Sequence, residues 1–112
     1  MNRTKDPIEY VWLVDHAGKE YCLRQLAEEC SELTKASLKL IRANNGETPL
    51  PQPIAWDALI EELADTQVML DLIVNGMLTP GERDDVERIY DEKLSRFTTR
   101  VQSPDWHRKP RP

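Results

Sequence analysis

The amino-acid sequence predicts an all-α protein, a helical bundle that oligomerisation completes. Apolar residues recur at helical rather than alternating spacing, and only 6% of the residues are aromatic. A chain of 112 residues with 39% hydrophobic content supports one domain, although its core is modest and association of copies would enlarge it. We therefore expect a single domain over residues 1–103, followed by a Pro-rich basic tail over residues 104–112.

The first half of the chain predicts two helices. A short helix runs from Pro7 to about His16, and Gly18 stops it. A long helix follows from about Lys19 to Ala43, and Asn44-Asn45-Gly46 ends it. The apolar stripe of the long helix is expected to consist of Leu23, Leu26, Ala27, Cys30, Leu33, Ser37, Leu40 and Ile41, with Glu29 on its shoulder.

The two cysteines, Cys22 and Cys30, fall within this long helix. A rise of about 1.5 Å per residue separates them by about 12 Å, which is too far for a disulfide. Both are therefore expected to be small core residues, as is common for free thiols in a reducing compartment.

A loop over residues 44–54 comes next, because Pro49, Pro51 and Pro53 keep it from becoming helical. It is longer than most connections in helical bundles, so it is either a lid or a passive surface loop. The following helix begins near Ala55 or Trp56 and ends near Asn75-Gly76. Since it is apolar on nearly every face, we expect it to be buried.

The start of the last helix is predicted by Thr79-Pro80-Gly81-Glu82, a capping box with proline at the first helical position. Pro104, Pro110 and Pro112 mark the end of ordered structure after it. One side of this helix carries Val86, Ile89, Tyr90, Leu94, Phe97 and Val101.

The charge and hydropathy pattern excludes several classes of partner. A net charge of −5 and a pI near 5.0 argue against binding to a nucleic-acid backbone. No apolar run reaches the roughly 20 residues that span a bilayer, and Met1-Asn2-Arg3-Thr4-Lys5 leads into no signal-peptide core. We therefore expect a soluble cytoplasmic protein without nucleic-acid or membrane partners.

Two pairs of carboxylates carry the most information about function. Glu29 and Glu32 lie on the first long helix, and Glu62 and Asp65 lie on the next. Residues three apart share one helix face, with Cβ atoms about 5–6 Å apart, so each pair can grip one ligand. Because carboxylates repel one another and are costly to desolvate, two facing pairs make physical sense chiefly around a bound cation.

Ligation by oxygen alone selects Mg²⁺, Mn²⁺ or Ca²⁺ over zinc or copper, and neither His16 nor His107 lies near these pairs in sequence. Magnesium is the predicted ion, with Mn²⁺ as a possible substitute. The alternative is that Glu61, Glu62 and Asp65 form a solvated acidic first turn that the helix dipole favours.

The stretch from about Leu23 to Val101 resembles the MazG-like all-α nucleoside triphosphate pyrophosphohydrolases. The mark of that family is Glu-Glu-x-x-Glu on one helix and Glu-x-x-Asp on the next, here Glu28-Glu29-x-x-Glu32 and Glu62-x-x-Asp65. The following helix carries Asp91-Glu92-Lys93-Leu94-Ser95-Arg96-Phe97, a basic run similar to that of small family members. The gap between Glu32 and Glu62 is at the long end for the family, which affects the loop more than the ligands.

The resemblance implies Mg²⁺-dependent hydrolysis of a nucleoside triphosphate to the monophosphate and pyrophosphate by a homodimer or homotetramer. Glu29, Glu32, Glu62 and Asp65 are then the metal ligands. Glu28 faces away from the stripe and is either a water-orienting catalytic group or a solvated surface residue.

The triphosphate also needs cationic side chains. Lys39 lies two turns beyond Glu32, and Lys93 and Arg96 share a face of the last helix, so these three are the predicted substrate-binding residues. Asp91 and Glu92 could pair with the last two instead. Base stacking could come from Trp12, Tyr21 or Trp56, each of which could equally be a core or interface aromatic.

Two further functions fit the same pattern. One is phosphoribosyl-ATP pyrophosphohydrolysis, which would use the same metal chemistry on a bulkier substrate. The other is a non-catalytic helical dimer that binds a nucleotide or a protein partner.

Overall fold

The computed structural model of the chain describes residues 7–106, and every regular element within that range is helical. The predicted all-α class is therefore confirmed. Residues 107–112 of the predicted tail lie outside the described residues, and the domain limit at residue 103 stays a prediction. The four helices are α1 (Pro7–Ala17), α2 (Lys19–Asn44), α3 (Gln52–Gly76) and α4 (Pro80–Val101).

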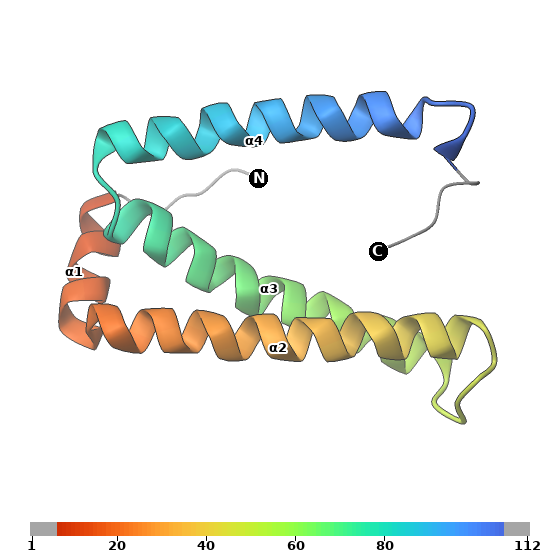
Figure 1. Ribbon diagram of the computed structural model, residues 1–112. Helices are drawn as coiled ribbons and strands as arrows, with labels where there is room; N and C mark the ends of the chain where they lie inside the picture. Colours follow the sequence, from red (N-terminus) through yellow and green to blue (C-terminus); the bar gives the residue numbers. More distant parts are fainter. Residues whose placement is uncertain (1–6, 107–112) are drawn as a thin grey trace. The chain divides into compact units, whose positions relative to one another are not determined.

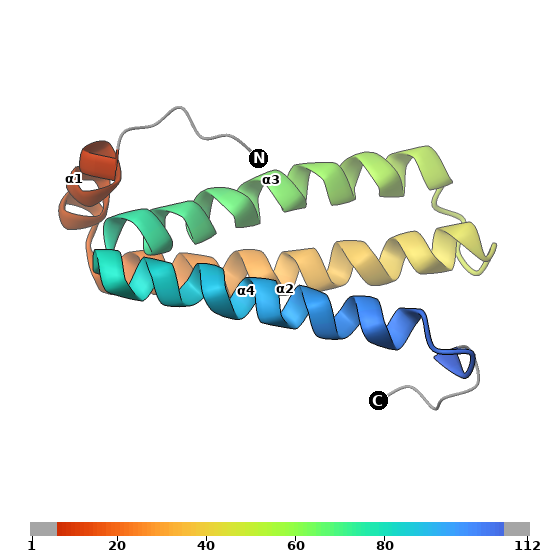
Figure 2. The ribbon, with the colours of Figure 1, turned by 90° about the horizontal axis from the view of Figure 1, so that it is seen from above.

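The chain divides into two compact units that we describe separately. The first ends at Met77 and contains α1, α2 and α3, while the second begins at Leu78 and contains α4. In the first unit, α2 and α3 lie side by side in opposite directions, and α1 crosses the end where α2 begins and α3 ends (Figures 1 and 2).

A single glycine separates α1 from α2. Gly18 has a φ of 102°, a conformation that side chains with a Cβ disfavour, and its N–H donates a 2.7 Å hydrogen bond to the carbonyl of Val14. The chain turns here without a loop, which confirms Gly18 as the predicted stop.

The seam between α2 and α3 follows a spacing of three and four residues on both helices. Thr66 of α3 donates a 3.4 Å hydrogen bond from Oγ1 to the carbonyl of Glu29, which fixes the register of the pair. The buried or half-buried seam residues are Cys22, Leu26, Glu29, Leu33, Ala36 and Leu40 on α2, and Ala55, Leu59, Glu62, Thr66, Met69 and Ile73 on α3.

This seam corrects the predicted stripe of α2. Four members of that stripe are exposed, namely Leu23, Ala27, Cys30 and Ile41. The prediction that both cysteines are core residues was therefore wrong for Cys30. The face toward α3 includes Cys22, Glu29 and Ala36, each one residue earlier than a member of the predicted stripe. Glu29 consequently lies in the seam and not on its shoulder.

Two predictions about α3 were wrong. The helix begins at Gln52 and not near Ala55, because Pro51 serves as the N-cap and Pro53 occupies the first turn, where its missing N–H costs nothing. Nor is the helix buried all round. Ile60 and Leu63 are about half exposed, at 51% and 50%, because α1 and α2 cover only the opposite face.

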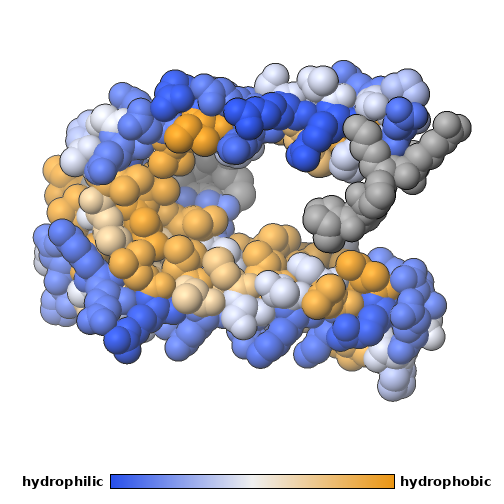
Figure 3. Space-filling model, in the orientation of Figure 1, coloured by the Kyte–Doolittle hydropathy of each residue, from blue (hydrophilic) through white to orange (hydrophobic). Residues whose placement is uncertain are grey.

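The core of the first unit lies where its three helices meet. Val14 of α1 is fully buried against Cys22 and Met69, and α1 crosses α3 closely at Gly76. Apolar surface (orange) remains exposed along this unit at the level of α3 (Figure 3).

The second unit confirms the predicted start of the last helix. Thr79 caps α4 by accepting from the Glu82 N–H at 3.2 Å, and the Glu82 carboxylate accepts from the Thr79 N–H at 2.9 Å. None of the residues of α4 is buried. Across residues 7–106, no helix has both the length and the apolarity required to cross a bilayer.

Candidate functional site

Three of the four predicted metal ligands meet at the seam. Glu29 comes from α2, and Glu62 and Asp65 come from α3, one turn apart. One carboxylate oxygen of each lies within 4.8 Å of the others, and all three residues are half-buried. We call this group the carboxylate triad.

Glu32 and Glu28 lie outside the triad. The exposed Glu32 side chain is held by Lys35, whose Nζ is 3.3 Å from its Oε1. Glu28 is exposed on α2. Both remain close enough to act electrostatically, because the charges of Glu28 and Glu32 contribute to raising the pKa of Glu29.

Crowding perturbs two members of the triad. Partial desolvation raises the pKa of Glu29, and the charge of Asp65 adds to this effect. Desolvation likewise raises the pKa of Glu62, with further contributions from Glu29 and Asp65. These carboxylates therefore resist ionisation in the folded chain.

One oxygen of the triad has no hydrogen-bond partner among the described residues. Oε2 of Glu62 is buried and accepts no hydrogen bond from the described part of the chain. A buried acceptor of this kind is costly, and a carboxylate oxygen is a preferred ligand of Mg²⁺ and Mn²⁺. The donor set of the triad thus suits a hard divalent cation.

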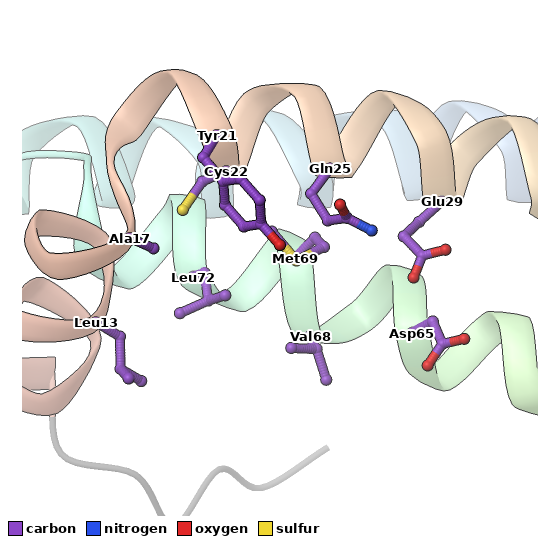
Figure 4. Close-up of a pocket in the computed structure, with 10 residues that line it drawn as sticks. All are labelled: Leu13, Ala17, Tyr21, Cys22, Gln25, Glu29, Asp65, Val68, Met69 and Leu72. Atoms are coloured by element: carbon purple, nitrogen blue, oxygen red, sulfur yellow. The ribbon is translucent and has the colours of Figure 1, made fainter.

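A pocket of about 320 Å³ opens on the α1 side of the triad (Figure 4). Glu29 and Asp65 project toward one another at one end of it, from α2 and α3 respectively (Figure 4). We call it the apolar pocket, because its other walls are formed by Leu13 and Ala17 of α1, Tyr21, Cys22 and Gln25 of α2, and Val68, Met69 and Leu72 of α3.

A second pocket lies on the side of the triad nearer the loop. It measures about 200 Å³, and we call it the lysine pocket because Lys35 and Lys39 line it. Glu32, Glu61 and Glu62 lie around it as well. The predicted phosphate-binding residue Lys39 therefore lines a pocket together with one triad member.

The other two predicted phosphate-binding residues belong to the second unit. Lys93 and Arg96 line a hollow along α4 with Phe97 and Arg100, and the Arg100 guanidinium lies 5.8 Å from the centre of the Phe97 ring. Their role toward a substrate stays a prediction.

Sequence reasoning missed Gln25 and Lys35. Each shares a helix face with an acidic residue that was identified, Gln25 four residues before Glu29 and Lys35 three residues after Glu32. That spacing is the only signal that could have found them. Among the predicted stacking aromatics, Tyr21 lines the apolar pocket, Trp12 stacks on His16 at 4.9 Å between ring centroids, and Trp56 is 49% exposed.

Comparisons with protein-family models, with curated proteins and with solved structures found no match for this chain.

Proposed function

We propose that this protein hydrolyses a nucleoside triphosphate to the monophosphate and pyrophosphate with the help of Mg²⁺. The observation that carries the proposal is the carboxylate triad: two helices bring three acidic side chains together, and a buried oxygen of one of them, Oε2 of Glu62, has no hydrogen-bond partner among residues 7–106. Such crowding of like charges is unfavourable by itself and becomes favourable when a divalent cation binds between them.

The reaction needs one water molecule. The bond between the α- and β-phosphoryl groups breaks, the water oxygen joins one of the two phosphorus atoms, and the water hydrogens leave with the products or as solvent protons. Bound Mg²⁺ would neutralise charge on the phosphoryl oxygens and align the water. Mn²⁺ has similar ligand preferences and is the proposed substitute.

Individual side chains are proposed to bind the ion, the water and the phosphates. Glu29, Glu62 and Asp65 would hold the ion, and Glu32, one turn beyond Glu29, would join them as a fourth ligand by exchanging its contact with Lys35 for the cation. Glu28 orients water from outside that shell. Lys39 contacts the phosphates from the lysine pocket. Contact of Lys93 and Arg96 with phosphate remains a prediction from the sequence.

The working unit that we propose is a homodimer or homotetramer. A second apolar stripe runs along α3 through Trp56, Ile60, Leu63 and Leu70, all between 40% and 51% exposed. On α4, Val86, Tyr90, Leu94, Phe97 and Val101 recur at the same spacing without being buried. Stripes of this spacing are the surfaces that helices of a bundle bury against one another.

Substitution of Glu62 by glutamine tests the proposed reaction. Glutamine keeps the shape but loses the charge that binds the ion, so kcat/KM should fall by about 100-fold or more, which corresponds to several kcal/mol of lost transition-state stabilisation. The measurement is release of pyrophosphate and monophosphate from a panel of NTPs and dNTPs with Mg²⁺, Mn²⁺ or EDTA.

Asp57→Asn provides the matched control, because Asp57 is an exposed residue of the same helix and loses the same charge. It should keep parental turnover. Equal turnover by Glu62→Gln and the parent would disprove the role of the triad. Absence of metal-dependent turnover of every triphosphate by the parent would disprove the reaction itself.

A further inference from the structure

The two pockets next to the carboxylate triad differ in chemistry. The apolar pocket shares Glu29 and Asp65 with the triad, and apart from these two its lining is uncharged. The lysine pocket shares Glu62 with the triad and carries Lys35 and Lys39. The triad therefore lies between a recess whose other described walls are uncharged and a recess that carries Lys35 and Lys39 beside Glu32, Glu61 and Glu62.

A nucleotide likewise consists of a charged part and an uncharged part. Its phosphates are anionic and need cationic or metal partners, whereas its base is flat and uncharged and tolerates burial against apolar side chains. Among residues 7–106, no cationic side chain lines the apolar pocket, and Glu29 and Asp65 would repel a phosphate in the absence of metal. Its volume of about 320 Å³ lies at the small end of ligand pockets, which suits a nucleoside rather than a larger group.

Within the apolar pocket, Gln25 is the side chain suited to recognising a base. It is half-buried on the α2 wall between Tyr21 and Glu29 (Figure 4), and no hydrogen bond to its side chain is present in the described part of the chain. A carboxamide offers both donors and an acceptor, so it can pair with the hydrogen-bonding edge of a base. Tyr21, which is 58% exposed, supplies an aromatic face at the mouth.

We infer that the apolar pocket holds the base of the nucleotide and that Gln25 determines which base is preferred, with the phosphates crossing the triad toward Lys35 and Lys39. This inference rests on the proposed function for the position of the phosphates. The placement of the base stands on the pocket itself and can be tested without turnover.

The first test replaces Gln25 by leucine and measures kcat/KM for ATP, GTP, CTP and UTP. Loss of one paired hydrogen-bonding group should reduce the preference of the parent for its best base by about tenfold, because that is the scale of one good base contact. Gln67→Leu is the matched control, since Gln67 is a half-buried glutamine of α3 outside the pocket. It should keep the parental ranking. A ranking that survives in Gln25→Leu would overturn the role of Gln25.

A second variant tests the pocket as a whole. Val68 lies in the opposite wall and is 56% exposed, so tryptophan can replace it without disturbing the core while filling the recess. Val68→Trp should raise KM for all four triphosphates by about tenfold and leave the thermal shift caused by Mn²⁺ alone unchanged. Unchanged KM values would place the base elsewhere.

A binding experiment separates this inference from the proposed reaction. Met69 lines the pocket, so its ¹³C-labelled methyl signal reports on a ligand there, and Met69→Leu assigns the signal. Titration with adenosine, guanosine, cytidine and uridine should give a saturable shift with at least one nucleoside, weakened several-fold in Gln25→Leu and Val68→Trp. If triphosphates are not hydrolysed but this shift occurs, the proposed reaction is disproved and binding of the base in the apolar pocket is supported. If no nucleoside moves the signal, the base pocket is wrong whatever the turnover.

Discussion

At the scale of single residues, identical side chains behave in opposite ways according to their neighbours. Hydrogen bonds from the backbone and hydroxyl of Thr79 lower the pKa of Glu82, so the capping box favours its charge. Desolvation and like charges raise the pKa of Glu62, so the seam opposes its charge. A raised pKa means that the folded chain binds this proton more tightly than the unfolded chain, so stability decreases as pH rises from about 4.5 through the raised value.

The raised pKa of Glu62 predicts how the stability of Glu62→Gln depends on pH in EDTA. Because glutamine carries no charge, the variant should have a higher Tm than the parent at pH 7, and the difference should vanish near pH 4, where Glu62 is protonated in both states. Thermal unfolding at the two pH values measures it, with Asp57→Asn as the control. A variant no more stable than the parent at pH 7 would show that the triad is not crowded in solution.

Glu62→Gln also tests whether a metal ion stabilises the protein through the triad. Saturating Mn²⁺ should raise the Tm of the parent by linkage to binding, and it should raise that of Glu62→Gln much less. Equal shifts would mean that the ion binds elsewhere.

At the scale of helices, α1 and α3 approach each other closely at Gly76. A Cβ placed there would lie 2.5 Å from Cγ2 of Val14 and 2.7 Å from the carbonyl oxygen of Tyr10, closer than such atoms pack. Glycine at this position therefore lets α1 lie directly against the end of α3, and this crossing forms the wall of the apolar pocket that carries Leu13 and Ala17.

Gly76→Ala should consequently destabilise the protein. Overpacking costs about 1–3 kcal/mol, which exceeds the gain of up to about 1 kcal/mol from replacing glycine in a helix. Urea unfolding measures the difference. Gly81→Ala is the matched control, because nothing lies within 4 Å of a Cβ at that position, and it should be neutral or stabilising. Equal effects of the two substitutions would disprove the close crossing.

The ends of helices could be predicted where the signal is local. Gly18 and the Thr79 capping box depend on residues within one turn, and both were placed correctly from sequence. The start of α3 was missed because Pro51 and Pro53 are compatible with either a loop or the first turn of a helix. The seam of α2 was misplaced because two neighbouring faces of this helix are both partly apolar. Only the contact with α3 shows which of the two is buried.

The candidate site shows the same limit. Spacing along one helix was enough to select Glu29, Glu62 and Asp65, which lie together. The same kind of spacing allows the Lys35–Glu32 ion pair within α2, but it could not show that Gln25 lines a pocket with Val68. That relation exists only after α2 and α3 are paired.

At the scale of the whole molecule, the apolar stripes on α3 and α4 are more than single exposed residues, because they continue over several turns at bundle spacing. A chain of 13.0 kDa with this pattern gains core by association. The proposed assembly should therefore have two or four times that mass in light scattering coupled to size exclusion.

The double variant Ile60→Gln/Leu63→Gln tests which surface is used. Both side chains are about half exposed within one chain, so their replacement should cost the monomer little, whereas at the centre of an interface it should raise the dissociation constant by about tenfold or more. The measured mass should then fall toward 13.0 kDa on dilution. Glu61→Gln, an exposed residue of the same helix on a face turned away from Ile60 and Leu63, should leave the mass unchanged. If the double variant keeps the parental mass at every concentration, the α3 stripe is not the interface. The mass of Leu94→Gln, measured before and after dilution, then decides whether α4 provides the interface.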